Sequence, residues 1–275
     1  MTALAEEHLT MPDQRWPWHE VLITGASSGL GRALAIACAA PGATLHLSGR
    51  NEARLAETAT ACEAAGARAL PRAIDVCDAA AMARWIAGAG RLDLVIANAG
   101  ISAGTGGRTE PGRVARAVFE TNVTGVLNTA LPALDAMATQ SPGADGIRGR
   151  IAVIASVAAS VAAPGAPAYC ASKAAVQRWA EALDATERRR GIRLHAVCPG
   201  YIRTPMTERN RFPMPLLMDA ERAALLTLGG IARGRVRIAY PWPLYLGARL
   251  AGALPPALRA ALFLRLPGKA SALPN

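Results

Sequence analysis

The sequence predicts an α/β fold in which a doubly wound parallel sheet forms a single domain, followed by an apolar helical extension. Three observations indicate this fold. From Glu20 onward, short apolar runs alternate with Ala-rich segments of helical length. A glycine-rich turn joins the first apolar run to the first helical segment. The 275 residues can bury the core of one such domain but leave no room for a second.

The predicted elements follow one another as repeated strand–helix units. Apolar runs rich in Leu or β-branched residues predict strands at 20–24, 43–48, 68–74, 92–97, 150–155, 192–198 and 235–239. Ala-rich segments between them predict helices at 29–40, 51–65, 78–89, 112–138 and 168–190. Asn51 and Gly66 are the start and stop signals of the second helix.

Three regions of the single domain, 1–275, are distinguished by composition. Residues 19–240 form the predicted core. The Pro-rich stretch 199–222 is irregular and follows a strand, so we interpret 203–222 as a substrate lid. The extension 240–275 is apolar but interrupted by Pro and Arg. It predicts two short helices, 244–253 and 257–266, both too short to span a membrane.

Charge and cysteine usage exclude several functional classes. The chain carries a net charge of +10, almost all of its cations are scattered Arg residues, and no recognition motif accompanies them. This favours a solvated basic surface over nucleic-acid binding, which we do not expect. The five cysteines lack CxxC spacing, so we expect free thiols and no metal site. Residues 1–18 contain acidic residues and no apolar run of signal-peptide length, which indicates a cytoplasmic protein.

The first strand leads into Thr24-Gly25-Ala26-Ser27-Ser28-Gly29-Leu30-Gly31, and a helix follows at once. Glycines allow a tight turn close to a pyrophosphate, and the N–H groups at the start of the helix favour its negative charge. The turn therefore predicts a Rossmann-like dinucleotide site. Its candidate contacts are Gly25, Ser27, Ser28, Gly29, Leu30 and Gly31.

The end of the second strand reads Ser48-Gly49-Arg50, where an acid usually binds the adenosine ribose of NAD. The lack of a carboxylate and the presence of the Arg50 guanidinium suit a 2′-phosphate. We therefore expect NADP rather than NAD. The alternative is that Arg50 is a solvated loop residue.

The fifth strand ends beside Ser156, and Tyr169 and Lys173 follow thirteen and seventeen residues later. Tyr and Lys at positions i and i+4 share one face of a helix, and a neighbouring ammonium favours the ionised form of a tyrosine. This spacing predicts an acid/base pair with a lowered tyrosine pKa. Ser156 is placed to hydrogen-bond a substrate oxygen.

From about residue 20 to 205 the chain resembles the short-chain dehydrogenase/reductase family, in its single-domain branch. The resemblance is carried by the glycine-rich turn, by Asn98-Ala99-Gly100 after the fourth strand, and by the Ser, Tyr and Lys just described. Further matching segments are Asp75-Val76 at the adenine, Asn122 in a helix, and Pro199-Gly200 with Thr204 beside the nicotinamide.

The resemblance implies a role for each matching residue. Tyr169 exchanges the proton, Lys173 binds the nicotinamide ribose and lowers the tyrosine pKa, Ser156 steadies the oxygen, and Asn122 holds a water in the proton relay. The implied activity is hydride transfer between NADP(H) and a carbonyl or secondary alcohol. A non-catalytic dinucleotide-binding protein on the same scaffold is the alternative, but all four catalytic residues are present.

Substrate, assembly and the role of the extension are less determined by sequence. Segments 101–110, 157–167 and 203–222 are expected to set specificity, and apolar lid residues favour a lipid-like, steroid-like or acyl ketone. These lid residues are Phe212, Met214, Leu216, Leu217 and Met218, which could instead pack on the protein itself.

The resemblance implies a homo-oligomer, a dimer or tetramer, packed through 112–138 and 168–190. Trp, Tyr and Arg in 240–275 suit peripheral membrane contact; a second lid and a dimer contact are the competing interpretations.

Overall fold

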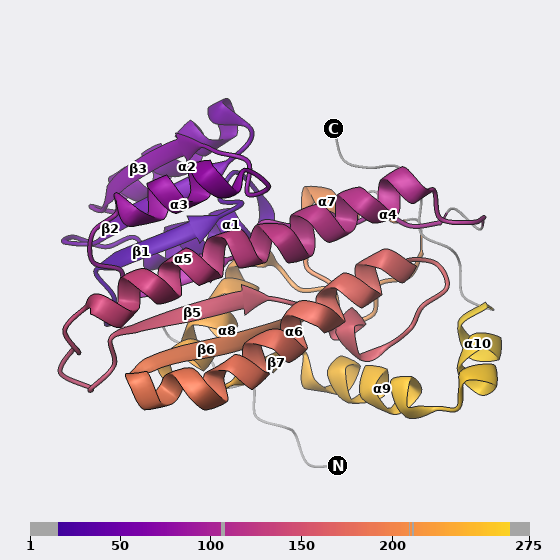
Figure 1. The fold of residues 1–275 in the computed structure, drawn as a ribbon. Helices are drawn as coiled ribbons and strands as arrows, with labels where there is room; N and C mark the ends of the chain where they lie inside the picture. The colour runs from indigo at the N-terminus through magenta and orange to yellow at the C-terminus, as the bar shows by residue number, and fades with distance from the viewer. Residues whose placement is uncertain (1–15, 106–107, 209, 211, 265–275) are drawn as a thin grey trace, which may run out of the picture.

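Seven parallel strands form the centre of the computed structural model, which describes residues 16–105, 108–208, 210 and 212–264 (Figure 1). They are β1 (Glu20–Thr24), β2 (Thr44–Gly49), β3 (Arg68–Ala73), β4 (Leu94–Ala97), β5 (Gly149–Ile154), β6 (Ile192–Pro199) and β7 (Arg237–Tyr240). Each strand begins and ends within two residues of its predicted limits. The strand order β3-β2-β1-β4-β5-β6-β7 is Rossmann-like. From β1 the sheet extends to β3 on one side and from β4 to β7 on the other, so the switch point lies between β1 and β4, where doubly wound sheets bind ligands.

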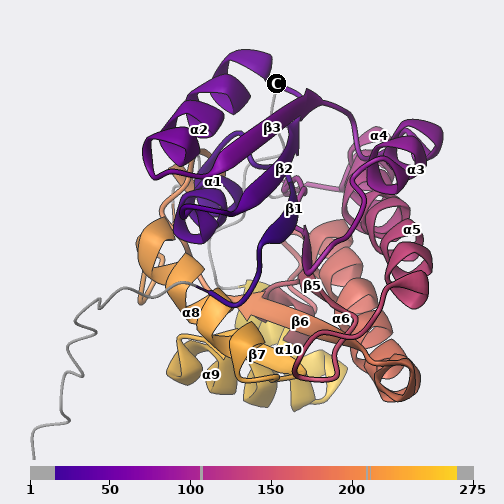
Figure 2. The same ribbon diagram turned by 90° about the vertical axis from the view of Figure 1, so that its left-hand side faces the viewer.

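Helices cover both faces of the sheet (Figure 2). One layer contains α1 (Gly29–Cys38), α2 (Glu52–Ala64) and α8 (Ala220–Ala232). The other contains α3 (Ala79–Ala87), α4 (Gly112–Phe119), α5 (Gly125–Thr139) and α6 (Pro167–Glu187). A sheet covered on both faces buries most side chains of its central strands, which explains why β1 and β4 are mainly apolar.

Neighbouring residues of β1 show how the core divides. Val21 and Ile23 belong to the apolar cluster beneath α1 and α8, whereas Leu22 belongs to the cluster beneath α3, α5 and α6. All three side chains are completely buried. The two clusters hold the sheet rigidly, and the strand ends at one edge are therefore a fixed platform for a site.

Two helical features differ from the prediction. The segment 112–138 is not one regular helix, because a π-helical turn, η1 (Glu120–Thr124), separates α4 from α5. Helix α8 was not predicted, and its Gly229-Gly230 pair lowers helix propensity. A Cβ at Gly230 would lie 2.6 Å from a methyl group of Ile238 on β7. Tight packing against the sheet therefore requires glycine at this position of α8.

The predicted helices of the extension are present as α9 (Trp242–Ala253) and α10 (Pro256–Leu264); the remainder of the prediction, from 265 onward, lies outside the described residues. Helix α9 packs on β7 and on a short 3₁₀ turn, η2 (Val157–Ser160), which follows β5. Within the described residues, no helix combines the length and the apolar composition needed to cross a membrane.

Candidate active site

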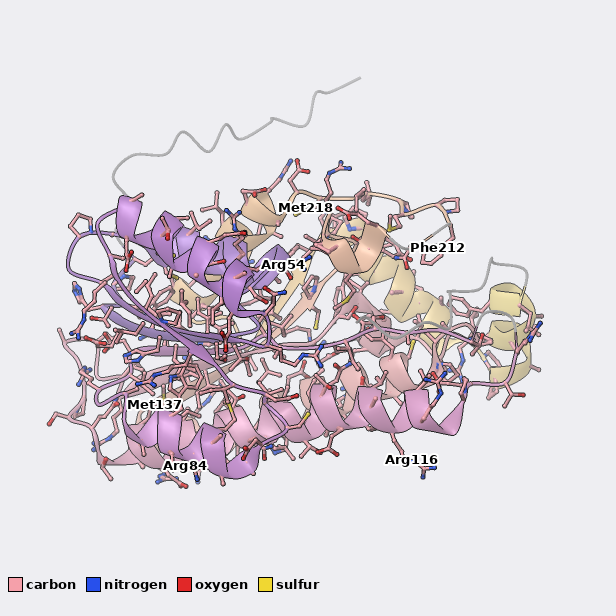
Figure 3. All side chains as sticks on the ribbon, turned by 90° about the horizontal axis from the view of Figure 1, so that it is seen from above. Arg54, Arg84, Arg116, Met137, Phe212 and Met218 are labelled. Carbon is pink, nitrogen blue, oxygen red and sulfur yellow. The ribbon has the colours of Figure 1, made fainter. Side chains whose placement is uncertain are left out.

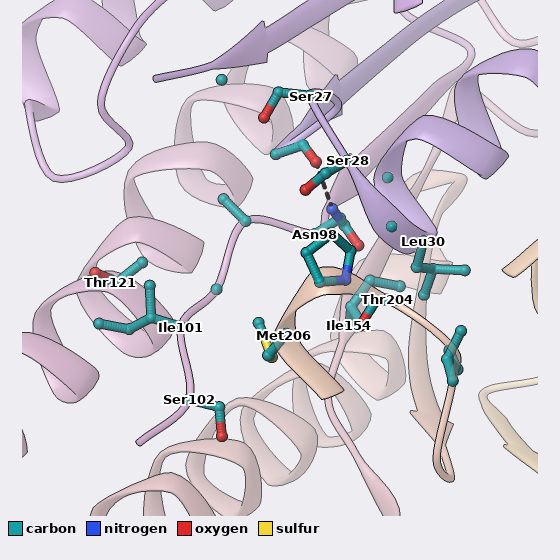
Figure 4. Close-up of a pocket in the computed structure, with 18 of the residues that line it drawn as sticks. Ser27, Ser28, Leu30, Asn98, Ile101, Ser102, Thr121, Ile154, Thr204 and Met206 are labelled. Atoms are coloured by element: carbon teal, nitrogen blue, oxygen red, sulfur yellow. Dashed lines mark hydrogen bonds between the residues drawn. The ribbon is translucent and has the colours of Figure 1, made fainter. Parts of the chain in front are cut away.

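A cavity of about 650 Å³ opens at the carboxyl edge of the sheet, around the switch between β1 and β4. Its volume is typical of ligand sites. All of the predicted cofactor contacts line it: Gly25, Ser27, Ser28, Gly29, Leu30, Gly31, Arg50, Asp75, Val76, Asn98, Ala99, Gly100, Tyr169, Lys173, Pro199, Gly200 and Thr204. Figure 4 shows Ser27 and Ser28 at one end of this cavity and Ser102 at the other.

The glycine-rich turn forms one end of the cavity. Gly25 and Gly29 have φ angles of +67° and +54°, a conformation that other residues rarely adopt. A Cβ at Gly31 would collide with the carbonyl oxygen of Gly25 and the side chain of Asn98. Ser28 precedes α1 without capping it through its side chain, which leaves the first N–H groups of the helix open to an anion.

Asn98, at the end of β4, holds this turn in place. Its Nδ2 donates to the carbonyl oxygens of Thr24 and Gly25 at 3.0 and 3.2 Å. The hydroxyl of Thr24 in return accepts from the backbone N–H groups of Asn98 and Ala99, both at 3.1 Å. The turn is thus pre-formed by strand-to-strand hydrogen bonds and has the shape of a phosphate cradle.

Two arginines border the cavity at the end of β2. Arg50 follows the strand, and Arg54 lies one helical turn later in α2, whose first turn is capped by Asn51 accepting from the Arg54 N–H at 2.9 Å. Both side chains are exposed. Arg54 was missed by sequence reasoning, although its i+4 spacing from Arg50 at a helix start was a usable signal. Figure 3 shows Arg54 on α2, in the opposite layer from Arg84 and Arg116.

Tyr169, Lys173 and Ser156 lie together on the cavity wall. Ser156 follows β5, is buried, and forms a side-chain hydrogen bond with Tyr169. The ammonium of Lys173 donates to the carbonyl oxygen of Ile154 at 2.8 Å and lies 5.9 Å from the centre of the Tyr169 ring. The helix start at Pro167 and the end of β5 therefore bring the three predicted groups to one place.

The predicted lowering of the tyrosine pKa is wrong in direction. Burial raises the pKa of Tyr169 to about 12, although its hydrogen bond with Ser156 acts in the opposite sense. Burial also lowers the pKa of Lys173 to about 8. The cost of removing the phenolate charge from water outweighs the hydrogen bond with Ser156, so at neutral pH the phenol is protonated.

Asn122 lies in the π-helical turn and is completely buried, behind the cavity wall and not on it. Its Oδ1 accepts from the Ile101 N–H at 2.8 Å, and its Nδ2 donates to the Ile101 carbonyl at 3.0 Å and to the Ser172 hydroxyl at 3.1 Å. A Cβ at Gly100 would lie 3.2 Å from Asn122 Oδ1 and 3.3 Å from Lys173 Nζ. Asn122 therefore ties η1 to the loop after β4 and to α6.

Glu110 is a second residue that sequence reasoning missed. It lies in the loop before α4, and its Oε2 accepts from the backbone N–H of Ala168 at 3.2 Å. Ala166, the residue before α6, provides no side-chain cap, so a distant carboxylate caps the helix that carries Tyr169. Local sequence could not have indicated this contact, because 58 residues separate its partners.

The apolar residues that the sequence assigned to the lid do not line the cavity. Phe212 packs edge-on against Tyr201, with ring centres 6.1 Å apart, and Met218 packs against the core. Leu216 is exposed. The lid instead contributes Thr204, Pro205, Met206 and Thr207 to the cavity, and Figure 4 shows Met206 between its two ends.

No cluster of His, Cys, Asp and Glu suited to a metal ion occurs among the described residues. All five cysteines are free thiols.

Comparisons with known proteins agree with this geometry. The family model of short chain dehydrogenases matches residues 19–213. An uncharacterized oxidoreductase of Myxococcus xanthus is 36% identical over 242 residues, which cover 86% of this chain and 93% of the relative. A candidate ketoacyl reductase of the granaticin polyketide synthase of Streptomyces violaceoruber is 36% identical over 194 residues, covering 69% of this chain and 70% of the relative.

Solved structures give the same result. A short-chain dehydrogenase/reductase of Burkholderia phymatum in complex with NAD superposes with a TM-score of 0.77 at 25% identity, covering 94% of this chain and 99% of the other. A short-chain dehydrogenase of Mycobacterium paratuberculosis bound to NAD superposes with a TM-score of 0.70 at 27% identity, covering 82% and 97%. The chain therefore belongs to the short-chain dehydrogenase/reductase family of oxidoreductases.

Proposed function

We propose that the protein is an NADP(H)-dependent oxidoreductase that reduces the carbonyl group of a hydrophobic ketone and oxidises the corresponding secondary alcohol in reverse. One observation carries this proposal. Tyr169, Lys173 and Ser156 share a single cavity with a pre-formed phosphate cradle. A proton donor and a dinucleotide site are the two parts that such a reaction requires.

The residues of the cavity fit a dinucleotide. The cradle from Gly25 to Gly31 and the open start of α1 suit its pyrophosphate. Asp75 and Val76 suit the adenine, and Lys173, Pro199 and Gly200 suit the nicotinamide half, as the family resemblance implies. When bound, NADP(H) would supply the hydride.

The preference for NADP rests on Arg50 and Arg54. Arg50 and not a carboxylate comes directly after β2, and Glu52, the first acidic residue that follows, does not line the cavity. Two guanidinium groups one helical turn apart border the cavity and suit a 2′-phosphate. The Burkholderia and Mycobacterium relatives hold NAD.

In the proposed reduction, the carbonyl carbon accepts a hydride and Tyr169 donates its phenolic proton to the oxygen, which completes the alcohol. Burial raises the pKa of Tyr169 to about 12, so its phenol is protonated at neutral pH, which is the form that donates a proton. Ser156 hydrogen-bonds the substrate oxygen. Lys173 contributes a positive charge beside Tyr169 below its own pKa of about 8. Asn122 acts indirectly, because its hydrogen bonds hold the loop at Ile101 and helix α6 in position.

A hydrophobic substrate is supported by the side chains at the catalytic end. Ile101, Ile202 and Met206 are among the residues that line the cavity. Flexible Met and other aliphatic side chains suit an irregular or extended apolar ligand. The candidate ketoacyl reductase among the relatives supports an acyl ketone within this class.

The test is NADPH oxidation with ketones of graded chain length, together with the reverse reaction on secondary alcohols. We expect turnover that rises with apolar chain length. The matched control is Tyr169→Phe, which should bind NADPH normally but not turn over. NADPH binding without turnover of any carbonyl or alcohol would instead support the non-catalytic alternative.

We also propose a homo-oligomer, a dimer or tetramer, formed through the α4–α5 and α6 surfaces. Phe119 and Leu131 are exposed large apolar side chains on α4 and α5. Symmetric burial of such side chains between two copies is a common basis for dimers. Light scattering at micromolar concentration should show an assembly that Leu131→Glu dissociates; a wild-type monomer would contradict the proposal.

A further inference from the structure

An apolar stripe of Trp242, Leu246 and Leu250 runs along one face of α9, and further exposed apolar side chains lie on α10. Five of the ten exposed large hydrophobic side chains among the described residues lie on these two helices, and a sixth, Leu254, directly follows α9; the five are Trp242, Leu246, Leu250, Leu258 and Leu264. Trp242, Leu246 and Leu250 are spaced four residues apart, so they share one face of α9. Trp242 is 68% exposed and Leu250 is 63% exposed. Contiguous exposed apolar surface of this kind usually marks an interaction site.

The opposite face of α9 is firmly attached to the enzyme core. A Cβ at Gly252 would collide with the carbonyl oxygen of Ser160, so this helix lies in close contact with η2. The hydroxyl of Tyr245 accepts from Arg237 at 2.8 Å, and Arg237 also forms an ion pair with Glu181 on α6. The stripe is therefore displayed on an anchored helix, with no flexible arm beneath it.

The charge of this part of the chain selects the kind of partner. Residues 222–275 contain no Asp or Glu but carry eight cations: Arg222, Arg233, Arg235, Arg237, Arg249, Arg259, Arg265 and Lys269. Arg249 and Arg259 are the two of these cations that lie on the described parts of α9 and α10, whereas Arg237 is paired with Glu181 and the residues from 265 onward lie outside the described residues. Arg249 is exposed directly beside Leu250. A surface that binds this face should be apolar and negatively charged.

An anionic lipid surface has both properties. Tryptophan prefers the headgroup level, guanidinium groups reach lipid phosphates, and short helices with one apolar face lie in the interface without crossing the membrane. A second copy of the chain fits less well, because a two-fold contact would bring the two sets of arginines together. In Figure 1 both helices lie toward the end of the molecule at which the strand arrows point.

We propose that α9 and α10 form a docking face for anionic lipid surfaces, with Trp242, Leu246 and Leu250 entering the interface and Arg249 binding lipid phosphate. Docking in this way places α9 at the interface, and α9 packs against η2, the turn that begins after Ser156. Under the proposed function, the site would then receive ketones dissolved in the membrane.

The test is flotation of the full chain with vesicles of phosphatidylcholine alone or with about a third phosphatidylglycerol. It needs no turnover, so its result is independent of the proposed function. We expect binding to the anionic vesicles at low salt and a marked loss at high salt. Arg249→Gln should weaken binding about fivefold, the value for one cation at such a surface. Arg84→Gln, on an exposed position of α3, should not.

The apolar contribution is tested with Leu250→Ser, which should weaken binding about tenfold, against Leu216→Ser, an exposed leucine outside the stripe. NADPH binding and thermal unfolding confirm that each variant is folded. Wild-type protein that ignores anionic vesicles at low salt would overturn the proposal. So would equal losses in the two leucine variants, or a switch from dimer to monomer by Leu250→Ser without any change in flotation.

Discussion

Removing the two arginines after β2 tests the cofactor assignment most directly. Arg50 and Arg54 border the cavity, and Asn51 fixes the helix start between them by a 2.9 Å hydrogen bond to the Arg54 N–H. A charge-assisted hydrogen bond contributes about 1.5–3 kcal/mol when shielded from water. Since both side chains are exposed, we expect about 1–1.5 kcal/mol for each, a five- to tenfold loss of NADPH affinity.

The double variant should lose less than the sum of the single losses, because both guanidinium groups bind the same phosphate. NADH affinity should change little in all three variants. Titration of NADPH and NADH by fluorescence at low and high salt measures these differences, and Arg84→Ala, an exposed arginine on α3, is the matched control. Equal losses for the two cofactors, or tighter NADH binding by the unaltered protein, would refute the reasoning.

Three further predictions concern the catalytic helix. Tyr169→Phe should retain fold and NADPH binding but lose carbonyl reduction by orders of magnitude, since it removes the proton donor; near-normal turnover would exclude that role. Burial lowers the pKa of Lys173 to about 8, so its ammonium loses a proton as the pH rises through this value. We therefore expect kcat/KM for reduction to be constant below pH 7.5 and to fall above pH 8. Tyr169, with a pKa of about 12, stays protonated over this range. A Lys173→Arg variant that retains the same fall would assign it to another group. Glu110→Ala should lower the melting temperature by about 2–4 °C through loss of the cap, and it should lower kcat more than it raises KM. Glu110→Gln, which retains the acceptor oxygen, should restore most of both, and no change in either variant would contradict the capping role.

Much of the fold was predictable because its signals are local. Strand β1 is a continuous apolar run, the turn after it has glycines at 25, 29 and 31, and the helix that follows is rich in Ala and Leu. Parallel strands place their carboxyl ends along one edge, so residues after different strands were expected to meet. All the predicted cofactor contacts do line one cavity.

Features that depend on close packing were not predictable. Helix α8 contains two adjacent glycines, and only the close contact of Gly230 with Ile238 explains why glycine stands inside this helix. No periodic pattern of apolar residues in the sequence indicates the π-helical turn at Asn122. Its amide bonds a loop 21 residues away and a hydroxyl 50 residues away.

Sequence by itself determined which chemical groups this protein brings to its site: a phosphate cradle, a tyrosine and lysine on one helical face, and a serine at a strand end. The residues that carry these groups are only a few positions apart in the sequence, and the geometry of a helix, strand or turn fixes where such neighbours lie. Only the tertiary structure decided how those groups behave. Burial raised the pKa of Tyr169 against the expectation from its neighbour, Glu110 capped α6 from a distant loop, and the apolar lid residues packed away from the cavity. Each of these outcomes depends on desolvation or on contacts between distant segments, which a sequence does not specify until the chain has folded.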